Sequence, residues 1–188
     1  MTRLLLIFSF VIALSLNSRA QVTLNGVTLP AELQINKQKL VLNGAGIRSK
    51  LFFKLYTIGL YLPAKSSDGA ALLNANKMMV VRFEITSDMI NSDNMSEAIN
   101  EGFDSSTKGN TSAIRTRIDK MLKTFSAEEI KIGDVFQIVY VPDLGTEIYK
   151  NAVLKSTIEG QDFKKALFGI WISDNPVNSS LRKELLGL

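Results

Sequence analysis

The chain contains no cysteine and no histidine. Without thiols, it has neither disulfides nor thiol redox chemistry, and it carries no lipid-modified cysteine. Without imidazoles, Ser-His-Asp and Cys-His nucleophile systems and the usual zinc sites are also excluded. Any catalysis has to use Arg, Lys, Tyr, Thr, Asp or Glu. No metal or cofactor is predicted, because the only adjacent acids, Glu128 and Glu129, follow Ser126 as at a helix start.

The first twenty residues have the pattern of a secretory signal peptide. Arg3 precedes an apolar run from Leu4 to Leu16, and the small-residue tripeptide Ser18-Arg19-Ala20 follows it. A membrane anchor is the alternative, but this run is shorter than the ~20 apolar residues that a spanning helix needs. We therefore predict a signal peptide over residues 1–20, cleavage near Ala20, and a periplasmic or secreted protein with no integral membrane segment.

The distribution of charge argues against nucleic acid as a partner. The chain has 22 basic and 18 acidic residues, and two of the basic residues, Arg3 and Arg19, lie in the predicted signal peptide. The lysines are scattered, and no run of five basic residues occurs. A nucleic-acid interface is therefore not predicted. Residues 21–188 suit a single domain with one core.

Periodicity predicts strands in the first part of this domain. Asn25-Gly26 between alternating apolar residues is a strong hairpin signal. Residues 47–55 alternate with a period of two, and the apolar positions change parity after Tyr56, which predicts a bulge near Thr57 and Gly59. Other short strands are predicted at residues 22–24, 27–29, 33–35, 40–42 and 77–85.

Helical periodicity appears in the middle and at the end of the chain. Apolar residues recur at helical spacing over residues 95–103 and 114–125, and again over residues 163–171 and 181–186. Strand patterns return over residues 135–141, 147–149 and 153–158, and residues 66–74 indicate a short helix. This order predicts an α+β domain in which an antiparallel sheet is covered on one face by helices. Gly44-Ala45-Gly46 lies in strand-like sequence, so it is not a phosphate-binding loop.

Arg48 is the leading candidate for a binding residue. It enters a strand-like run dominated by apolar and aromatic side chains. A guanidinium keeps its charge in a protein, so next to apolar surface it requires a carboxylate-like partner or water. By pattern alone, the alternative is an exposed strand residue beside Lys50 and Lys54.

Three segments resemble the secreted bacterial branch of the chalcone isomerase-like family. They are Asn-Gly-Ala-Gly-Ile-Arg over residues 43–48, Tyr-Thr-Ile-Gly-Leu-Tyr over residues 56–61, and the tail from Phe163 to Gly187. The resemblance implies the open sandwich of that family, a large antiparallel sheet covered on one face by a layer of helices, over residues 21–188.

The family includes enzymes that close chalcones to flavanones and non-catalytic relatives that bind fatty acids. By resemblance, the catalytic arginine of the enzymes falls on Arg48, and their threonine falls on Tyr56 or Thr57. The enzymes also use a tyrosine, a lysine and an asparagine from one helix. These positions fall on Met95, Ala98 and Gly102, which cannot supply the hydrogen bonds that an enolate needs.

The resemblance therefore favours a non-catalytic protein that binds a small apolar carboxylate, such as a fatty acid. Arg48 would hold the carboxylate, with Tyr56 and Thr57 as further candidate ligand-binding residues. One alternative is an intramolecular lyase acting on a chalcone-like or other enone substrate, with Arg48, Tyr56 and Thr57 as catalytic donors. Another is an interaction module of the cell envelope without a small ligand.

Overall fold

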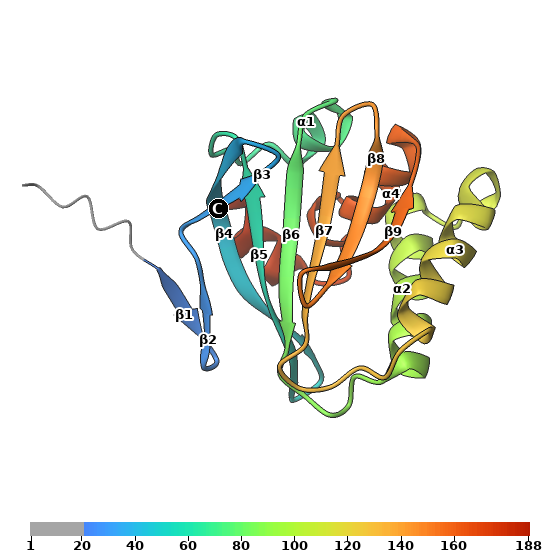
Figure 1. Ribbon diagram of the computed structural model, residues 1–188, viewed down its shortest axis with the longest axis horizontal. Helices are drawn as coiled ribbons and strands as arrows, with labels where there is room; N and C mark the ends of the chain where they lie inside the picture. The colour runs from blue at the N-terminus through green and yellow to red at the C-terminus, as the bar shows by residue number, and fades with distance from the viewer. Residues whose placement is uncertain (1–20) are drawn as a thin grey trace, which may run out of the picture.

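The computed structural model describes residues 21–188, and the predicted signal peptide lies outside this range. Its centre is an antiparallel sheet of seven strands, in which spatial order follows chain order from β3 to β9 (Figure 1). The strands are β3 (Glu32–Ile35), β4 (Gln38–Lys50), β5 (Phe53–Leu62), β6 (Met79–Ile85), β7 (Val135–Val141), β8 (Gly145–Lys150) and β9 (Val153–Ile158). A separate hairpin, β1 (Val22–Leu24) and β2 (Val27–Leu29), turns at the predicted Asn25-Gly26.

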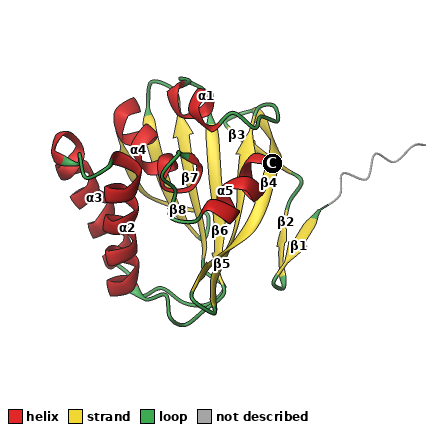
Figure 2. Cartoon of the chain, turned by 180° about the vertical axis from the view of Figure 1, so that it is seen from behind, coloured by secondary structure: helices red, strands yellow, loops and turns green. Residues whose placement is uncertain are grey.

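The helices cover one face of the sheet, as the view from behind shows (Figure 2). They are α1 (Gly69–Asn74), α2 (Ser92–Thr107), α3 (Arg115–Ser126), α4 (Gln161–Ile172) and α5 (Ser179–Leu186), with a 3-10 turn, η1 (Ser112–Ile114), before α3. The predicted α+β class and the antiparallel sheet with a helical layer are confirmed. Within residues 21–188, no helix is long and apolar enough to cross a membrane.

Each face of the sheet has its own apolar core. The larger core lies between the sheet and the helices and includes Ile58, Phe103 and Leu167, all fully buried. The smaller core lies on the other face, where Leu29 of the β1–β2 hairpin packs with Tyr61. The Tyr61 hydroxyl donates to the carbonyl of Pro30 at 3.0 Å. The hairpin thus covers the part of the sheet near β4 and β5 that the helices leave open.

The predicted continuous strand over residues 47–55 is wrong, because the chain reverses inside it. β4 ends at Lys50 and β5 begins at Phe53, and Leu51 has a φ of +56°. The turn contains no Gly, Pro, Asn or Asp, so no residue pattern indicated a turn at this point. The bulge lies at Leu55, since Arg48 pairs with Tyr56 while Ser49 pairs with Lys54. It therefore comes just before Tyr56 and not near Thr57 and Gly59.

Two glycines of β4 allow α5 to lie against the strand. A Cβ atom on Gly44 would be 2.1 Å from the carbonyl oxygen of Glu184. On Gly46 it would be 2.0 Å from the Glu184 carboxylate. The Asn43 amide donates to the carbonyl of Leu185 at 2.7 Å. The Gly-Ala-Gly segment is thus a packing surface for the last helix.

Lys164 is a fully buried cation that serves the fold. Its Nζ atom donates to the carbonyl oxygens of Leu72, Leu73 and Ala75 at 2.7–3.1 Å, at the C-terminal end of α1. These carbonyls have no partner within the helix, and a cation is favourable there. Burial lowers the pKa of Lys164 to about 8. The side chain therefore joins α4 to α1 and has no part in the cavity described below.

Candidate ligand-binding site

An apolar cavity with a volume of about 70 Å³ lies between the sheet and the helices. A buried water needs ~10–15 Å³ of such space, so the cavity has room for on the order of five water-sized groups. Its walls come from β4, β5, β6 and β7 on the sheet side and from α2, α3 and α4 on the helix side. Representative lining residues are Arg48, Tyr56, Phe83, Met95, Met121 and Trp171.

Arg48 and Tyr56 lie directly opposite each other on β4 and β5. Both line the cavity, because the bulge at Leu55 turns Tyr56 to the same face of the sheet as Arg48. The Tyr56 ring packs against Phe83 of β6, with 5.0 Å between ring centroids. The structure thus brings together two of the predicted site residues.

The Tyr56 hydroxyl is arranged as a hydrogen-bond donor toward the cavity. Trp171 Nε1 donates to the Tyr56 oxygen at 3.1 Å, and the nearby positive charge of Arg48 acts to lower the pKa of this hydroxyl. A phenol oxygen has two acceptor lone pairs and one proton. Trp171 engages one lone pair, and the phenol proton has no acceptor among the hydrogen bonds of residues 21–188, so it remains for an outside acceptor. Burial raises the pKa of Tyr56, and the contacts with Trp171 and Arg48 oppose this only in part, so the hydroxyl keeps its proton near neutral pH.

The Arg48 guanidinium has no carboxylate partner within residues 21–188. One of its terminal nitrogens donates a hydrogen bond to the backbone carbonyl of Ser49. The side chain is half-buried on the cavity wall. At the exposed rim, Lys50 forms an ion pair of 3.7 Å with Glu101 of α2. An anion that enters the cavity therefore meets a guanidinium whose charge no internal acid neutralises.

Thr57 does not join this pair. Side chains alternate across a strand, so the residue after Tyr56 points to the other face of the sheet. Thr57 is fully buried there, and its hydroxyl donates to the carbonyl of Leu24 in β1 at 3.3 Å. The expectation that Thr57 contacts a ligand beside Arg48 is therefore corrected: its hydroxyl holds the β1–β2 hairpin.

Trp171 is a site residue that the sequence pattern did not reveal. Its place on an apolar helical stripe indicated only a core side chain, and it is buried as expected. It also lines the cavity and positions the Tyr56 hydroxyl. A usable signal existed, because a buried indole N–H requires an acceptor. The sequence did not show which acceptor, since Tyr56 lies 115 positions away along the chain.

The helix positions that the resemblance assigned to the enzymes carry no polar group here. Met95 and Ala98 of α2 line the cavity. Gly102 faces Ile170 of α4, and a Cβ atom at this position would come within 2.9 Å of that side chain. The helix wall of the cavity is therefore apolar where an enolate would need donors.

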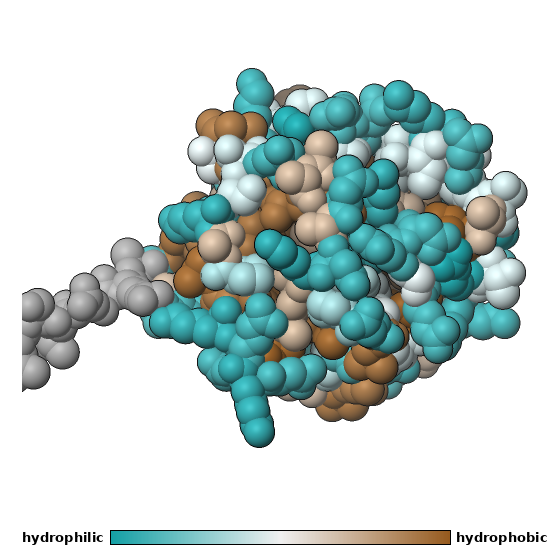
Figure 3. Space-filling model, turned by 90° about the horizontal axis from the view of Figure 1, so that it is seen from above, coloured by the Kyte–Doolittle hydropathy of each residue, from teal (hydrophilic) through white to brown (hydrophobic). Residues whose placement is uncertain are grey.

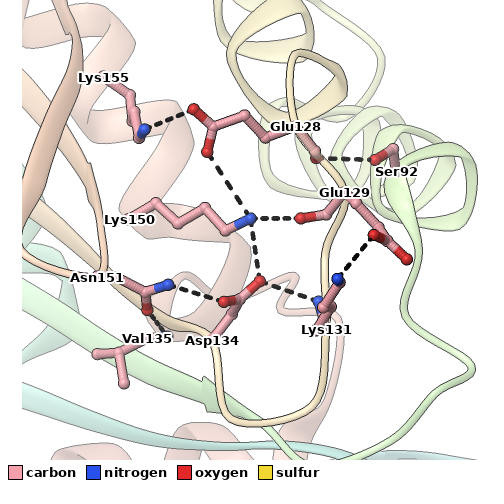
Figure 4. A network of polar contacts seen from close by, with 9 residues as sticks. All are labelled: Ser92, Glu128, Glu129, Lys131, Asp134, Val135, Lys150, Asn151 and Lys155. Atoms are coloured by element: carbon pink, nitrogen blue, oxygen red, sulfur yellow. Dashed lines mark hydrogen bonds and ion pairs between the residues drawn. The ribbon is translucent and has the colours of Figure 1, made fainter.

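A polar network joins β8, the start of α2 and the loop before β7 (Figure 4). Lys150 of β8 lies 3.0 Å from Asp134, and it also hydrogen-bonds to the carbonyl of Glu129. Ser92, at the start of α2, donates to the carbonyl of Glu128 at 3.2 Å. These contacts fasten the loop between α3 and β7. Within residues 21–188, no acidic side chains cluster in a way that could hold a metal ion.

The chain belongs to the chalcone isomerase-like family, whose sequence model matches residues 21–187. Among solved structures, it is similar to the Arabidopsis thaliana fatty-acid binding protein AtFAP1. The TM-score is 0.70 at 14% sequence identity, and the match covers 89% of this chain and 96% of that one. At this identity, the likeness shows a shared fold. No match was found among curated protein sequences.

Proposed function

We propose that this protein binds a small apolar carboxylate, such as a fatty acid, in the cavity between sheet and helices. The observation that carries the proposal is the Arg48 guanidinium, which lines an apolar cavity without a carboxylate partner within residues 21–188. Arg48 binds the carboxylate through charge-assisted hydrogen bonds, and Tyr56 donates its hydroxyl proton to the same group. The fatty-acid binding protein AtFAP1 has the same fold, which supports this assignment.

Binding without catalysis fits the chemistry of the cavity wall. Arg48 and Tyr56 offer donors on the sheet side only, while Met95 and Ala98 make the facing helix apolar. Such a wall suits an acyl chain and offers nothing to a developing oxyanion. The lyase alternative gains no support from this arrangement.

The size of the cavity limits the ligand. About 70 Å³ accommodates a carboxylate and a short chain. A longer chain requires side chains of the wall to move. Met95 and Met121 are suited to this, because an unbranched thioether adopts many conformations at low cost. Short and medium chains should therefore bind without rearrangement of the helices.

The site of action proposed here is outside the cytoplasm, as in the secreted bacterial branch of the family. The support is the signal-peptide pattern of residues 1–20, with cleavage near Ala20. Sequencing the N-terminus of the protein recovered from the periplasm or medium tests this directly. A mature chain that begins at Gln21 supports the proposal, and an intact N-terminus retained inside the cell refutes it.

Trp171 provides a direct assay of binding, because it is the single tryptophan and lines the cavity. Its fluorescence is followed while decanoate is titrated into a solution of the protein comprising residues 21–188. Decanol is titrated in a parallel experiment as the uncharged analogue. Decanoate should bind more tightly than decanol. Removing a hydrogen bond to a charged group costs ~1.5–3 kcal/mol, so Arg48→Ala should weaken decanoate binding roughly 10- to 100-fold.

The matched control is Arg115→Ala, which removes an equal charge from the exposed surface of α3. It should leave the affinity for decanoate unchanged. If Arg48→Ala binds decanoate as tightly as the wild type, the proposed role of Arg48 is wrong. Mass spectrometry of the organic acids that leave the purified wild-type protein on denaturation then identifies the natural ligand.

A further inference from the structure

Exposed apolar side chains gather at one end of the sheet. Nine large hydrophobic residues of the described chain are exposed, and seven of them lie in turns, in loops or in the first residues of strands at this end. The seven are Leu51, Phe52, Phe53, Met89, Ile132, Val153 and Leu154. Scattered exposed apolar residues are normal on a soluble protein, but a gathering of this kind marks an interaction surface.

The antiparallel topology brings these segments together. The β4–β5 turn, the loop after β6, the loop before β7 and the β8–β9 turn all lie at the lower end in Figure 1. Backbone hydrogen bonds connect them: Thr86 N donates to Leu55 O at 3.0 Å, and Gly133 N donates to Ile85 O at 2.9 Å. The opposite end, seen in Figure 3, is covered mainly by hydrophilic side chains.

The β4–β5 turn is the most prominent part of this end. Leu51 is 85% exposed and Phe52 is 98% exposed, so neither side chain packs on the domain. Leu51 also has the left-handed φ of +56°, which is costly for a bulky residue. Gly or Asn would form the same turn without this strain and without exposing apolar surface. These two positions therefore reduce stability and solubility with no gain inside the fold.

The turn is also cationic. Lys50 and Lys54 flank the apolar tip, and residues 33–67 contain no aspartate or glutamate. Lys50 is paired with Glu101 of α2 at 3.7 Å, but both side chains are more than half exposed, so this pair is weak. The nearby acids of the loop before β7 are ion-paired: Glu129 lies 3.0 Å from Lys131, and Asp134 lies 3.0 Å from Lys150. Basic side chains beside projecting aromatic and aliphatic ones are the pattern of a surface that inserts into an anionic lipid layer.

We propose that this end of the domain docks on an anionic lipid bilayer, with Leu51 and Phe52 inserted among the acyl chains and Lys50 and Lys54 against the headgroups. A narrow projecting tip fits a deformable bilayer better than it fits a rigid protein surface. Docking places the rim of the cavity, where Lys50 lies, at the bilayer surface. The proposal that this end docks on a bilayer does not depend on which ligand the cavity binds. Uptake of an apolar carboxylate from the bilayer, in contrast, rests on the proposed function.

The test uses residues 21–188, which contain the whole sheet, all described helices and both cores. The apolar residues 4–16 are left out, because they would partition into lipid themselves. Binding is measured by co-sedimentation with vesicles of phosphatidylcholine mixed with phosphatidylglycerol, and with vesicles of phosphatidylcholine alone. The wild type should bind the anionic vesicles more tightly, and added salt should weaken this binding.

The variant Leu51→Ser/Phe52→Ser should bind the anionic vesicles at least roughly 100-fold more weakly, since each of the two apolar side chains contributes ~1.5–3 kcal/mol on burial. The matched control is Leu144→Ser, an exposed leucine of the β7–β8 turn at the opposite end, and it should bind like the wild type. The double variant should keep its decanoate affinity in solution, so failure of docking is distinguishable from failure of the proposed function.

Three results would overturn the proposal. The wild type could fail to bind anionic vesicles, or the double variant could bind them as tightly as the wild type. Alternatively, light scattering could show a wild-type dimer that Leu51→Ser/Phe52→Ser dissociates, in which case the tip contacts a second copy of the chain. Leu51 and Phe52 are both exposed, so the double variant is expected to fold.

Discussion

Gly44 of β4 should be the glycine least tolerant of a methyl group on this strand. In Gly44→Ala, the new Cβ atom would lie 2.1 Å from the Glu184 carbonyl oxygen and 2.7 Å from that of Leu185. Favourable contacts begin near ~3.5 Å. Both oxygens belong to the backbone of α5, so relief requires the helix itself to move by roughly 1 Å.

The cost follows from the contacts of α5. Forcing extra volume into a packed interface costs ~1–3 kcal/mol. Moving α5 also weakens the 2.7 Å hydrogen bond from Asn43 to the Leu185 carbonyl, which contributes ~0.5–1.5 kcal/mol. We expect Gly44→Ala to lower the free energy of unfolding by about 2–4 kcal/mol. Since Gly46→Ala meets the side chains of Glu184 and Leu181, which can rotate, it should cost about 1–2 kcal/mol.

Urea unfolding followed by Trp171 fluorescence measures both variants against the wild type under one set of conditions. Gly46→Ala serves as the matched control, because it adds the same methyl group two residues along the same strand. A change of less than ~0.5 kcal/mol in the unfolding free energy of Gly44→Ala, or a greater loss of stability in Gly46→Ala, would contradict the predicted clash with the α5 backbone.

Three other changes test the roles assigned to two residues near the cavity and to the buried Lys164. Tyr56→Phe removes one donor and should weaken decanoate binding about tenfold in the Trp171 fluorescence titration; unchanged affinity would contradict the donor role. Thr57→Val should leave decanoate affinity unchanged, because this side chain lies on the other face of the sheet; a large loss of affinity would place it in the site. For Lys164, the pKa of about 8 in the folded state lies below the usual value of 10.5. As the pH rises, Lys164 therefore loses its proton at a lower pH in the folded state than in the unfolded state, so the unfolded state binds more protons in between. In urea titrations, the stability of the wild type relative to Lys164→Met should rise by up to about 3 kcal/mol between pH 8 and pH 10.5, and a pH-independent difference would contradict this.

Much of the architecture could be predicted from periodicity. The strands over residues 135–141 and 153–158 have the predicted bounds, and α2 to α5 contain the predicted apolar stripes. These elements follow local rules, because the spacing of apolar residues along the chain sets which face of a helix or strand is buried. The Asn25-Gly26 hairpin follows in the same way from the backbone preferences of its two turn residues.

The arrangement of the site depends on a turn and a bulge that the local sequence pattern does not predict. Leu51 and Phe52 form a turn without any turn residue, and the bulge at Leu55 decides that Tyr56 faces the cavity while Thr57 faces the β1–β2 hairpin. A shift of one residue in a strand exchanges its two faces.

The amino-acid sequence determined the fold class, the absence of thiol and imidazole chemistry, and the candidacy of Arg48. Which residues join Arg48 in the cavity depends on contacts between elements far apart in the chain. Trp171 reaches Tyr56 through the packing of α4 on the sheet, and an approach of two segments so distant along the chain leaves no trace in local periodicity.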